Sequence, residues 1–147
     1  MATDIVIRTG LDRLRYAVLF EGLLVVIFSI AMFLLFERSL LDMGAFSVAL
    51  SSIALVINFV YNLTYDRVDV RYGRVPTERS RAGRIVHAIG FEFTLVVVNL
   101  PLIMWWMQWS FSQALGFDII AMAAVVVYTY FFTLAYDRLF PIEQADS

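Results

Sequence analysis

Four long apolar segments dominate the sequence and restrict the class of fold that it can adopt. They cover residues 14–36, 44–65, 85–107 and 114–136. Each has the twenty-odd residues that an α-helix needs to cross roughly 30 Å of hydrocarbon. The chain is 61% hydrophobic with a mean hydropathy of +0.79, so little of it remains for a soluble domain. The sequence therefore predicts an all-α integral membrane protein with four transmembrane helices.

The basic residues predict how these helices are oriented. All eleven are arginine, and Arg38 alone lies in the two loops at 37–43 and 108–113. Because short cytoplasmic loops carry an excess of positive charge, both termini and the central linker are expected in the cytoplasm. Trp105, Trp106 and Trp109 then lie at the outer boundary, where an aromatic belt is the simplest interpretation. The first apolar segment has the length of a membrane span, so no cleavable signal peptide is expected.

A repeat with an offset of 71 residues relates the two halves of the chain without a gap. The repeated positions include Arg13 and Arg84, Tyr16 and His87, Ala17 and Ala88, Phe20 and Phe91, and Glu21 and Glu92. The triplet Tyr-Asp-Arg that closes the first half also closes the second. We therefore expect two tandem helical hairpins related by an axis along the membrane normal.

The repeat also predicts the domain boundaries. The expected parts are a cytoplasmic N-terminus at 1–12, transmembrane pairs at 13–67 and 84–138, a cytoplasmic linker at 68–83 and a cytoplasmic tail at 139–147. Asp69, Tyr72, Gly73, Pro76 and Ser80 are typical of a solvated loop within the linker. Asp66 precedes an arginine, with which it is expected to pair.

Glu21 and Glu92 are the main candidate functional residues. Each lies roughly 10 Å inside the predicted cytoplasmic boundary. A carboxyl group in a low dielectric favours its neutral form, whereas an adjacent cation favours the carboxylate. One site could therefore hold either a proton or a cationic substrate. A charge at the centre of a transmembrane helix costs about 2.5–3.5 kcal/mol, and such residues are functional candidates by default.

Polar and aromatic residues at similar depths are expected to support the glutamates. Asn58, Tyr61 and Asn62 share one helical face, level with Glu21. The other supporting candidates are Tyr128 and Thr129 level with Glu92, Tyr16 and His87 one turn nearer the cytoplasm, and Phe20 and Phe91 as possible cation–π partners.

Two other classes of function stay open at this point. A non-transporting four-helix scaffold or assembly protein could use the same glutamates as ties between helices. An intramembrane enzyme is disfavoured, because the chain has one histidine, no cysteine and no evident metal-ligand cluster. We expect no cofactor, no bound metal and no nucleic-acid partner.

Four segments resemble the motifs of the proteobacterial antimicrobial compound efflux (PACE) family. They are RLRYAVLFE at 13–21, NFVYNLTYD at 58–66, RIVHAIGFE at 84–92 and YTYFFTLAYDRLFP at 128–141. The resemblance implies an inner-membrane transporter made of two bacterial transmembrane pair domains. It implies export of chlorhexidine, acriflavine-like dyes and short diamines in exchange for protons, with the acid at Glu21 coupling the two.

The resemblance also places Glu92, Asn58, Tyr61 and Asn62 on matching motifs of the family. Tyr16 departs from the family pattern, which usually has a histidine there, and Ile57 stands where a tryptophan is common. We further expect a homodimer, because four helices alone enclose little room for a drug-sized ligand.

Overall fold

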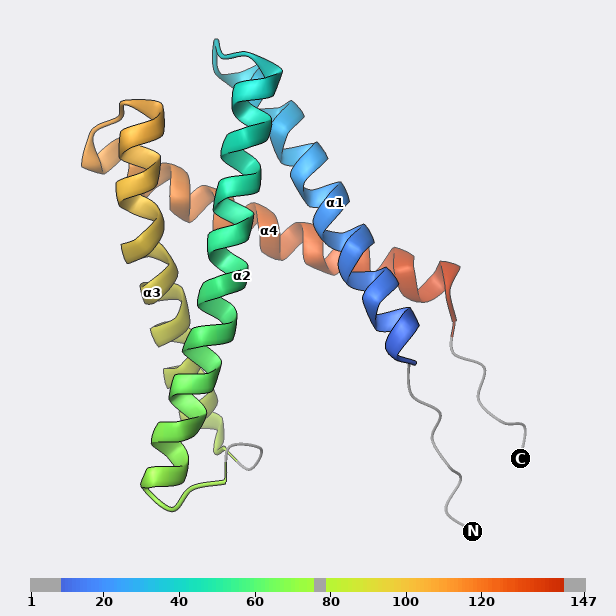
Figure 1. Ribbon diagram of the computed structural model, residues 1–147, viewed down its shortest axis with the longest axis vertical. Helices are drawn as coiled ribbons and strands as arrows, with labels where there is room; N and C mark the ends of the chain where they lie inside the picture. Colours follow the sequence, from blue (N-terminus) through green and yellow to red (C-terminus); the bar gives the residue numbers. More distant parts are fainter. Residues whose placement is uncertain (1–8, 76–78, 142–147) are drawn as a thin grey trace. The chain divides into compact units, whose positions relative to one another are not determined.

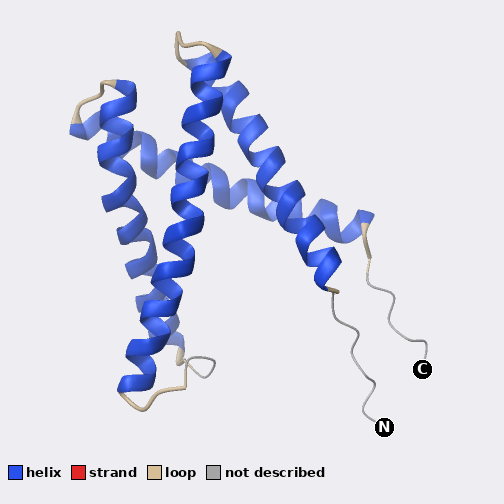
Figure 2. Ribbon diagram, viewed as in Figure 1, coloured by secondary structure: helices blue, strands red, loops and turns tan. Residues whose placement is uncertain are grey.

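Four α-helices make up most of the computed structural model, which describes residues 9–75 and 79–141. The helices are α1 (Gly10–Leu35), α2 (Leu40–Arg71), α3 (Arg81–Met107) and α4 (Phe111–Leu139) (Figure 1). Figure 2 shows them joined by loops, with no strand among the described residues. All four are long and apolar enough to cross a membrane, which confirms the predicted all-α membrane fold.

Side-chain caps mark where two of the helices begin. Thr9 accepts a hydrogen bond of 3.2 Å from the backbone N–H of Asp12 at the start of α1. Ser80 accepts one of 3.1 Å from the backbone N–H of Gly83 at the start of α3. Each cap satisfies a backbone donor that has no partner within its helix. Both helices therefore begin one turn before the predicted spans.

The segment expected as a linker at 68–83 begins with the last turn of α2, which continues to Arg71. Asp69 lies in this last turn and is buried, with 4% of its surface exposed, rather than in a solvated loop. Arg79 explains the difference, since it approaches Asp69 from the start of the next hairpin and makes burial of the carboxylate possible. Pro76, also assigned to the linker, lies outside the described residues.

The contacts divide the chain into two compact units, which we call unit 1 and unit 2. Unit 1 comprises residues 1–44 and 120–147, and unit 2 comprises residues 45–119. Unit 1 therefore holds α1 with most of α4, and unit 2 holds α3 with most of α2.

Unit 1 is held together by tyrosines that connect α1 with α4. The Tyr128 hydroxyl donates a hydrogen bond of 2.8 Å to the backbone oxygen of Phe20. The hydroxyls of Tyr16 and Thr133 are 2.9 Å apart and hydrogen-bonded. In the absence of a hydrophobic driving force within lipid, such bonds and close packing hold transmembrane helices together.

Unit 2 pairs α2 with α3, which run side by side in opposite directions (Figure 1). The Tyr61 hydroxyl donates a hydrogen bond of 3.0 Å to the backbone oxygen of His87. At the other end of the pair, Phe46 is fully buried and contacts the rings of Trp106 and Phe117. Trp106 therefore packs inside the unit, whereas Trp105 is 68% exposed.

Ring contacts in unit 1 recur in unit 2 with the 71-residue offset of the sequence repeat. Tyr16 contacts Phe132 at 5.2 Å between ring centroids, and the equivalent pair, His87 and Tyr61, is also 5.2 Å apart. The two other equivalent pairs are Tyr16–Tyr136 with His87–Tyr65, at 4.9 and 4.7 Å, and Phe20–Phe132 with Phe91–Tyr61, at 5.2 and 5.5 Å. In each unit, the first helix of one repeat therefore packs against the second helix of the other repeat.

Gly90 allows Tyr61 to approach α3 closely enough to make its hydrogen bond. A Cβ atom at Gly90 would lie 2.4 Å from the Tyr61 hydroxyl oxygen, well inside van der Waals contact. We expect Gly90→Ala to displace this hydroxyl and to destabilise the fold by about 1 kcal/mol, through the lost hydrogen bond and strain. Reversible unfolding in mixed detergent micelles would measure the change.

Gly22→Ala is the matched control for this substitution. Gly22 also lies inside a transmembrane helix, and nothing lies within 4 Å of the position that its Cβ would take. Its replacement should leave stability unchanged or slightly increased, because alanine favours helix more than glycine does. Equal effects of the two substitutions would contradict the steric explanation.

Candidate functional site

Glu21 lies on α1 within unit 1, half-buried next to a cluster of aromatic rings. Phe20 precedes it, and the Phe20 ring contacts Tyr128 and Phe132 at 5.1 and 5.2 Å. Glu21 is near enough to Tyr128 for its charge to act on the phenol group. An acid beside several π-faces is an arrangement that can bind an organic cation, by ion pairing and by cation–π contact.

The aromatic cluster continues along α1 toward its N-terminal end. Tyr16 contacts Phe20, Phe132 and Tyr136. Arg15 lies beyond it and places its guanidinium 3.8 Å from the Phe140 ring centroid. The structure therefore brings together four of the candidates identified from the sequence: Glu21, Phe20 and Tyr16 on α1, and Tyr128 on α4. Thr129 lies on the same helix, where its hydroxyl bonds to the backbone oxygen of Val125.

The equivalent cluster in unit 2 surrounds the helical turn before Glu92. Phe91 and His87 contact Tyr61, and His87 also contacts Tyr65 at 4.7 Å. The Nε2 atom of His87 is buried and has no hydrogen-bond partner among the described residues. Glu92 itself is exposed on the surface of this unit. The rings are thus preserved between the units, while the environments of the two glutamates differ.

Asn58 and Asn62 bond to each other on α2. The Asn62 amide nitrogen lies 2.7 Å from both the backbone and the side-chain oxygen of Asn58. Glu21, for which these amides were predicted as partners, lies in the other unit. Their support of its carboxylate stays a prediction, as does that of Tyr128 and Thr129 for Glu92.

Comparison with known proteins assigns the chain to a family. The sequence profile described as the chlorhexidine efflux transporter, a bacterial transmembrane pair profile, matches twice, at residues 8–71 and 79–142. Both matches have the same length and are displaced by the 71 residues of the repeat. The chain belongs to the chlorhexidine efflux transporter family. This is the PACE family, so the resemblance in the motifs is confirmed, and the chain is a transporter rather than an enzyme.

Curated relatives support the same assignment over most of the chain. A short-chain diamines transporter of Acinetobacter baumannii is 32% identical over 127 residues, which cover 86% of each chain. A short-chain diamines transporter of Vibrio parahaemolyticus is 30% identical over 130 residues, 88% of this chain and 91% of the relative. No solved structure matches the chain.

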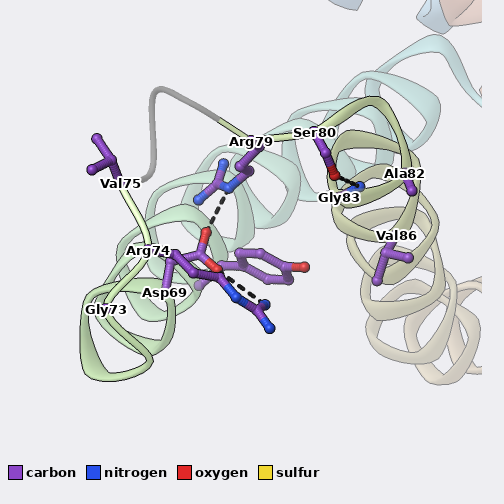
Figure 3. A pocket seen from close by; sticks show the side chains of 10 residues that line it. Asp69, Gly73, Arg74, Val75, Arg79, Ser80, Ala82, Gly83 and Val86 are labelled. Carbon is purple, nitrogen blue, oxygen red and sulfur yellow. Dashed lines mark hydrogen bonds and ion pairs between the residues drawn. The ribbon is translucent and has the colours of Figure 1, made fainter.

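A second polar group in this transporter lies where the linker joins α2 to α3. Arg79 donates a hydrogen bond of 2.6 Å to Asp69 (Figure 3). It donates another to Asp66. Asp66 thus pairs with Arg79, whereas the sequence suggested its neighbouring arginine. The bond to Asp69, followed by the bond to Asp66, raises the pKa of Arg79 above its ordinary value, so the guanidinium stays charged.

Asp69 and Arg79 line a cavity of about 640 Å³, together with Tyr65 and Arg74. Figure 3 shows the Asp69 carboxylate between Arg79 and Arg74, on the wall formed by the end of α2. Because two aspartates already neutralise Arg79, the cavity offers no unpaired basic group for an anionic ligand at that residue. We interpret the cluster as an anchor that joins the two hairpins.

Asp118 is a residue that sequence reasoning missed, although it lies inside the fourth predicted span. It is a buried polar residue, with 4% of its surface exposed. Its place in an apolar run of span length is the signal that could have identified it, since acids within transmembrane segments are costly and usually functional. The repeat hides it, because the equivalent residue of the first half is Ser47.

Proposed function

We propose that this transporter exports cationic antimicrobial compounds, such as chlorhexidine and acriflavine-like dyes, and short diamines in exchange for protons. The observation that carries the proposal is Glu21, an acid within a membrane span that lies beside the rings of Phe20 and Tyr128. The family description names chlorhexidine, and the relatives are named as transporters of short-chain diamines. All of these compounds are organic cations, which suits a carboxylate flanked by π-faces.

Glu21 performs the exchange by holding one partner at a time. In lipid surroundings a lone carboxylate is costly, so the group is either protonated or paired with a cation. Arrival of a cationic substrate from the cytoplasm releases the proton, and a proton from the outside later releases the substrate. Each charge that crosses 100 mV is associated with about 2.3 kcal/mol, so the membrane potential and the proton gradient can drive export.

Glu92 is the second coupling candidate in this proposal. Phe91, Tyr61 and His87 surround the turn before it, as the equivalent rings surround Glu21. Tyr16 and Tyr128 contact the Phe20 ring beside Glu21, while Asn58, Asn62 and Thr129 remain candidate supporting residues. The loss of symmetry between the two acids suggests that they differ in role, with Glu21 as the principal exchanger.

We further propose that the protein is a multi-pass protein of the bacterial inner membrane with both termini in the cytoplasm. The support is the distribution of arginines, ten against one. Single cysteines test this directly, because the native chain has none. A membrane-impermeant maleimide added outside spheroplasts should label Ser112→Cys and not Ala82→Cys; the reverse pattern would contradict the orientation.

A homodimer of parallel subunits completes the proposed assembly. Because nearly all arginines favour one side, two oppositely inserted copies are disfavoured. Transport then involves alternating access within parallel subunits. Crosslinking in native membranes should give dimers whose termini lie on the same side, and crosslinks between oppositely inserted copies would contradict this assembly.

Purified protein in liposomes tests the proposed function. A pH step is imposed across the liposome membrane without any substrate gradient. Acriflavine, chlorhexidine and a diamine should then each move in the direction opposite to the proton flow. Movement that responds to the substrate gradient and not to the pH step would contradict proton coupling while leaving transport intact.

A further inference from the structure

Asp118 lies near the start of α4, within unit 2, on the side of the helix that faces α3. Its carboxyl group is buried, and its Oδ2 atom has no hydrogen-bond partner among the described residues. An unpaired acceptor of this kind in a low dielectric is costly, and a charged one is more so. The position therefore needs either a proton or a positively charged partner.

Two residues of α3 are the polar neighbours of Asp118. Asn99 hydrogen-bonds to the Asp118 carboxyl group, and the charge of Glu92 acts on it as well. Asn99 and Glu92 are seven residues apart, so they lie on the same face of α3. Their Cα atoms are separated by about 10 Å along the helix, from a rise of 1.5 Å per residue. The three side chains therefore form a polar row along α3 and α4.

The row has too many acceptors for the donors that the protein supplies. The side-chain oxygen of Asn99 is also buried without a partner in the described part of the chain. Together, Asp118 and Asn99 offer oxygens to a group that carries several N–H donors and a positive charge. A primary ammonium, with three donors and no acceptor, has this chemistry.

The first half of the chain lacks an equivalent of this group. The residues at the offset of 71 from Asn99 and Asp118 are Phe28 and Ser47, whereas Glu92 has its counterpart in Glu21. Packing of a repeated helical pair therefore does not require the acid or the amide. The additional residues give unit 2 a feature that the symmetric scaffold does not explain.

We propose that Asp118 and Asn99 bind one ammonium group of a diamine while Glu92 binds the other. The proposal rests on the proposed function in one respect, namely that the chain accepts amine cations. Glu92 and Asn99, which hydrogen-bonds to Asp118, are about 10 Å apart along α3, a separation that a flexible diamine with a charge at each end can span. The length of the row therefore determines which length of diamine binds best.

Calorimetric titration of the purified full-length protein in detergent tests the site without any transport step. Diaminopropane, putrescine, cadaverine and diaminohexane are the probes, and butylamine is the singly charged control. Asp118→Asn should weaken binding of the best diamine about tenfold or more, through the lost ion pair, so that its affinity approaches that of the singly charged butylamine. A diamine affinity that Asp118→Asn leaves unchanged overturns the proposal.

Asp118→Glu gives a sharper result and applies even where Asp118→Asn does not fold. It keeps a carboxyl group but advances it by one methylene, so the best-bound diamine should become shorter by about one methylene. An unchanged preference for diamine length contradicts the proposed selection by length. Asp42→Glu is the matched control, because Asp42 pairs with Arg38 at the start of α2 and should not alter the preference.

The failure of this inference can be distinguished from failure of the proposed function. Proton-driven export of acriflavine by the wild-type protein reports on exchange at Glu21 and needs no diamine. If acriflavine is exported but substitution of Asp118 leaves the diamine affinities unchanged, only the proposed diamine site is refuted. Absence of all proton-driven export would refute the proposed function, whatever the titrations show.

Discussion

Glu21→Gln should abolish proton-driven export, lowering the counterflow of acriflavine in liposomes about a hundredfold or more. Glutamine keeps the size and hydrogen-bonding capacity of glutamate but can neither release a proton nor neutralise a cation. Loss of a positioned proton-transfer group commonly lowers rates by a factor of about 10²–10⁴. Glu21 is the one acid of the predicted span at 14–36, so this segment has no other acid that could replace it.

Two glutamines at other positions serve as controls for this result. Glu37→Gln makes the same chemical change in the exposed loop between α1 and α2 and should leave counterflow unchanged. Glu92→Gln separates the two repeated acids and should reduce transport less than Glu21→Gln does. If cells remain equally resistant with Glu21→Gln while the fold is weakened, the glutamate is a tie between helices, as in the scaffold interpretation.

Arg79→Met should destabilise the protein by about 2 kcal/mol, the second large effect that we expect. Methionine keeps the length of the side chain but removes the charge that pairs with Asp69, whose side chain is only 5% exposed. Removing one partner of a buried polar pair leaves the other unsatisfied, which typically costs about 1–3 kcal/mol, and more for a fully buried ion. Equilibrium unfolding in mixed micelles would measure this loss.

Arg74→Met is the matched control for the anchor at the linker. Arg74 also faces Asp69, but at 3.9 Å and with 71% of its side chain exposed. Exposed ion pairs contribute roughly 0–1 kcal/mol, so this variant should remain close to the wild type. Similar losses for the two variants would mean that general charge balance, rather than the buried contact of Arg79, stabilises the linker.

The fold could be predicted largely from the sequence, because membrane spans leave few alternatives. The lengths of the apolar segments predicted the four helices, and the repeated positions from Arg13 to Arg138 predicted two related hairpins. The pairing of helices across the repeats was not predicted. The sequence argument compares the depths of residues within the membrane. It does not determine which helix a given face packs against, because any helix with a suitable residue at that depth satisfies the argument.

The residues that sequence reasoning misplaced or missed depend on contacts distant in the chain. Asp69 reads as part of a polar loop until Arg79 provides a partner from the next hairpin. Asp118 is a single acid in an apolar run, and its neighbours Asn99 and Glu92 come from another helix. Neither arrangement leaves a periodic signal, whereas the glutamates were found because the repeat places one at the same position of each half.

Proton release on substrate binding is the most direct measurement of the central claim, exchange at Glu21. Purified wild-type protein in a weakly buffered solution near neutral pH should release protons when chlorhexidine is added, as followed by a pH-sensitive dye. Glu21→Gln should release far fewer, and Glu37→Gln should release as many as the wild type. Binding of chlorhexidine by the wild-type protein without any change in bound protons would contradict the exchange.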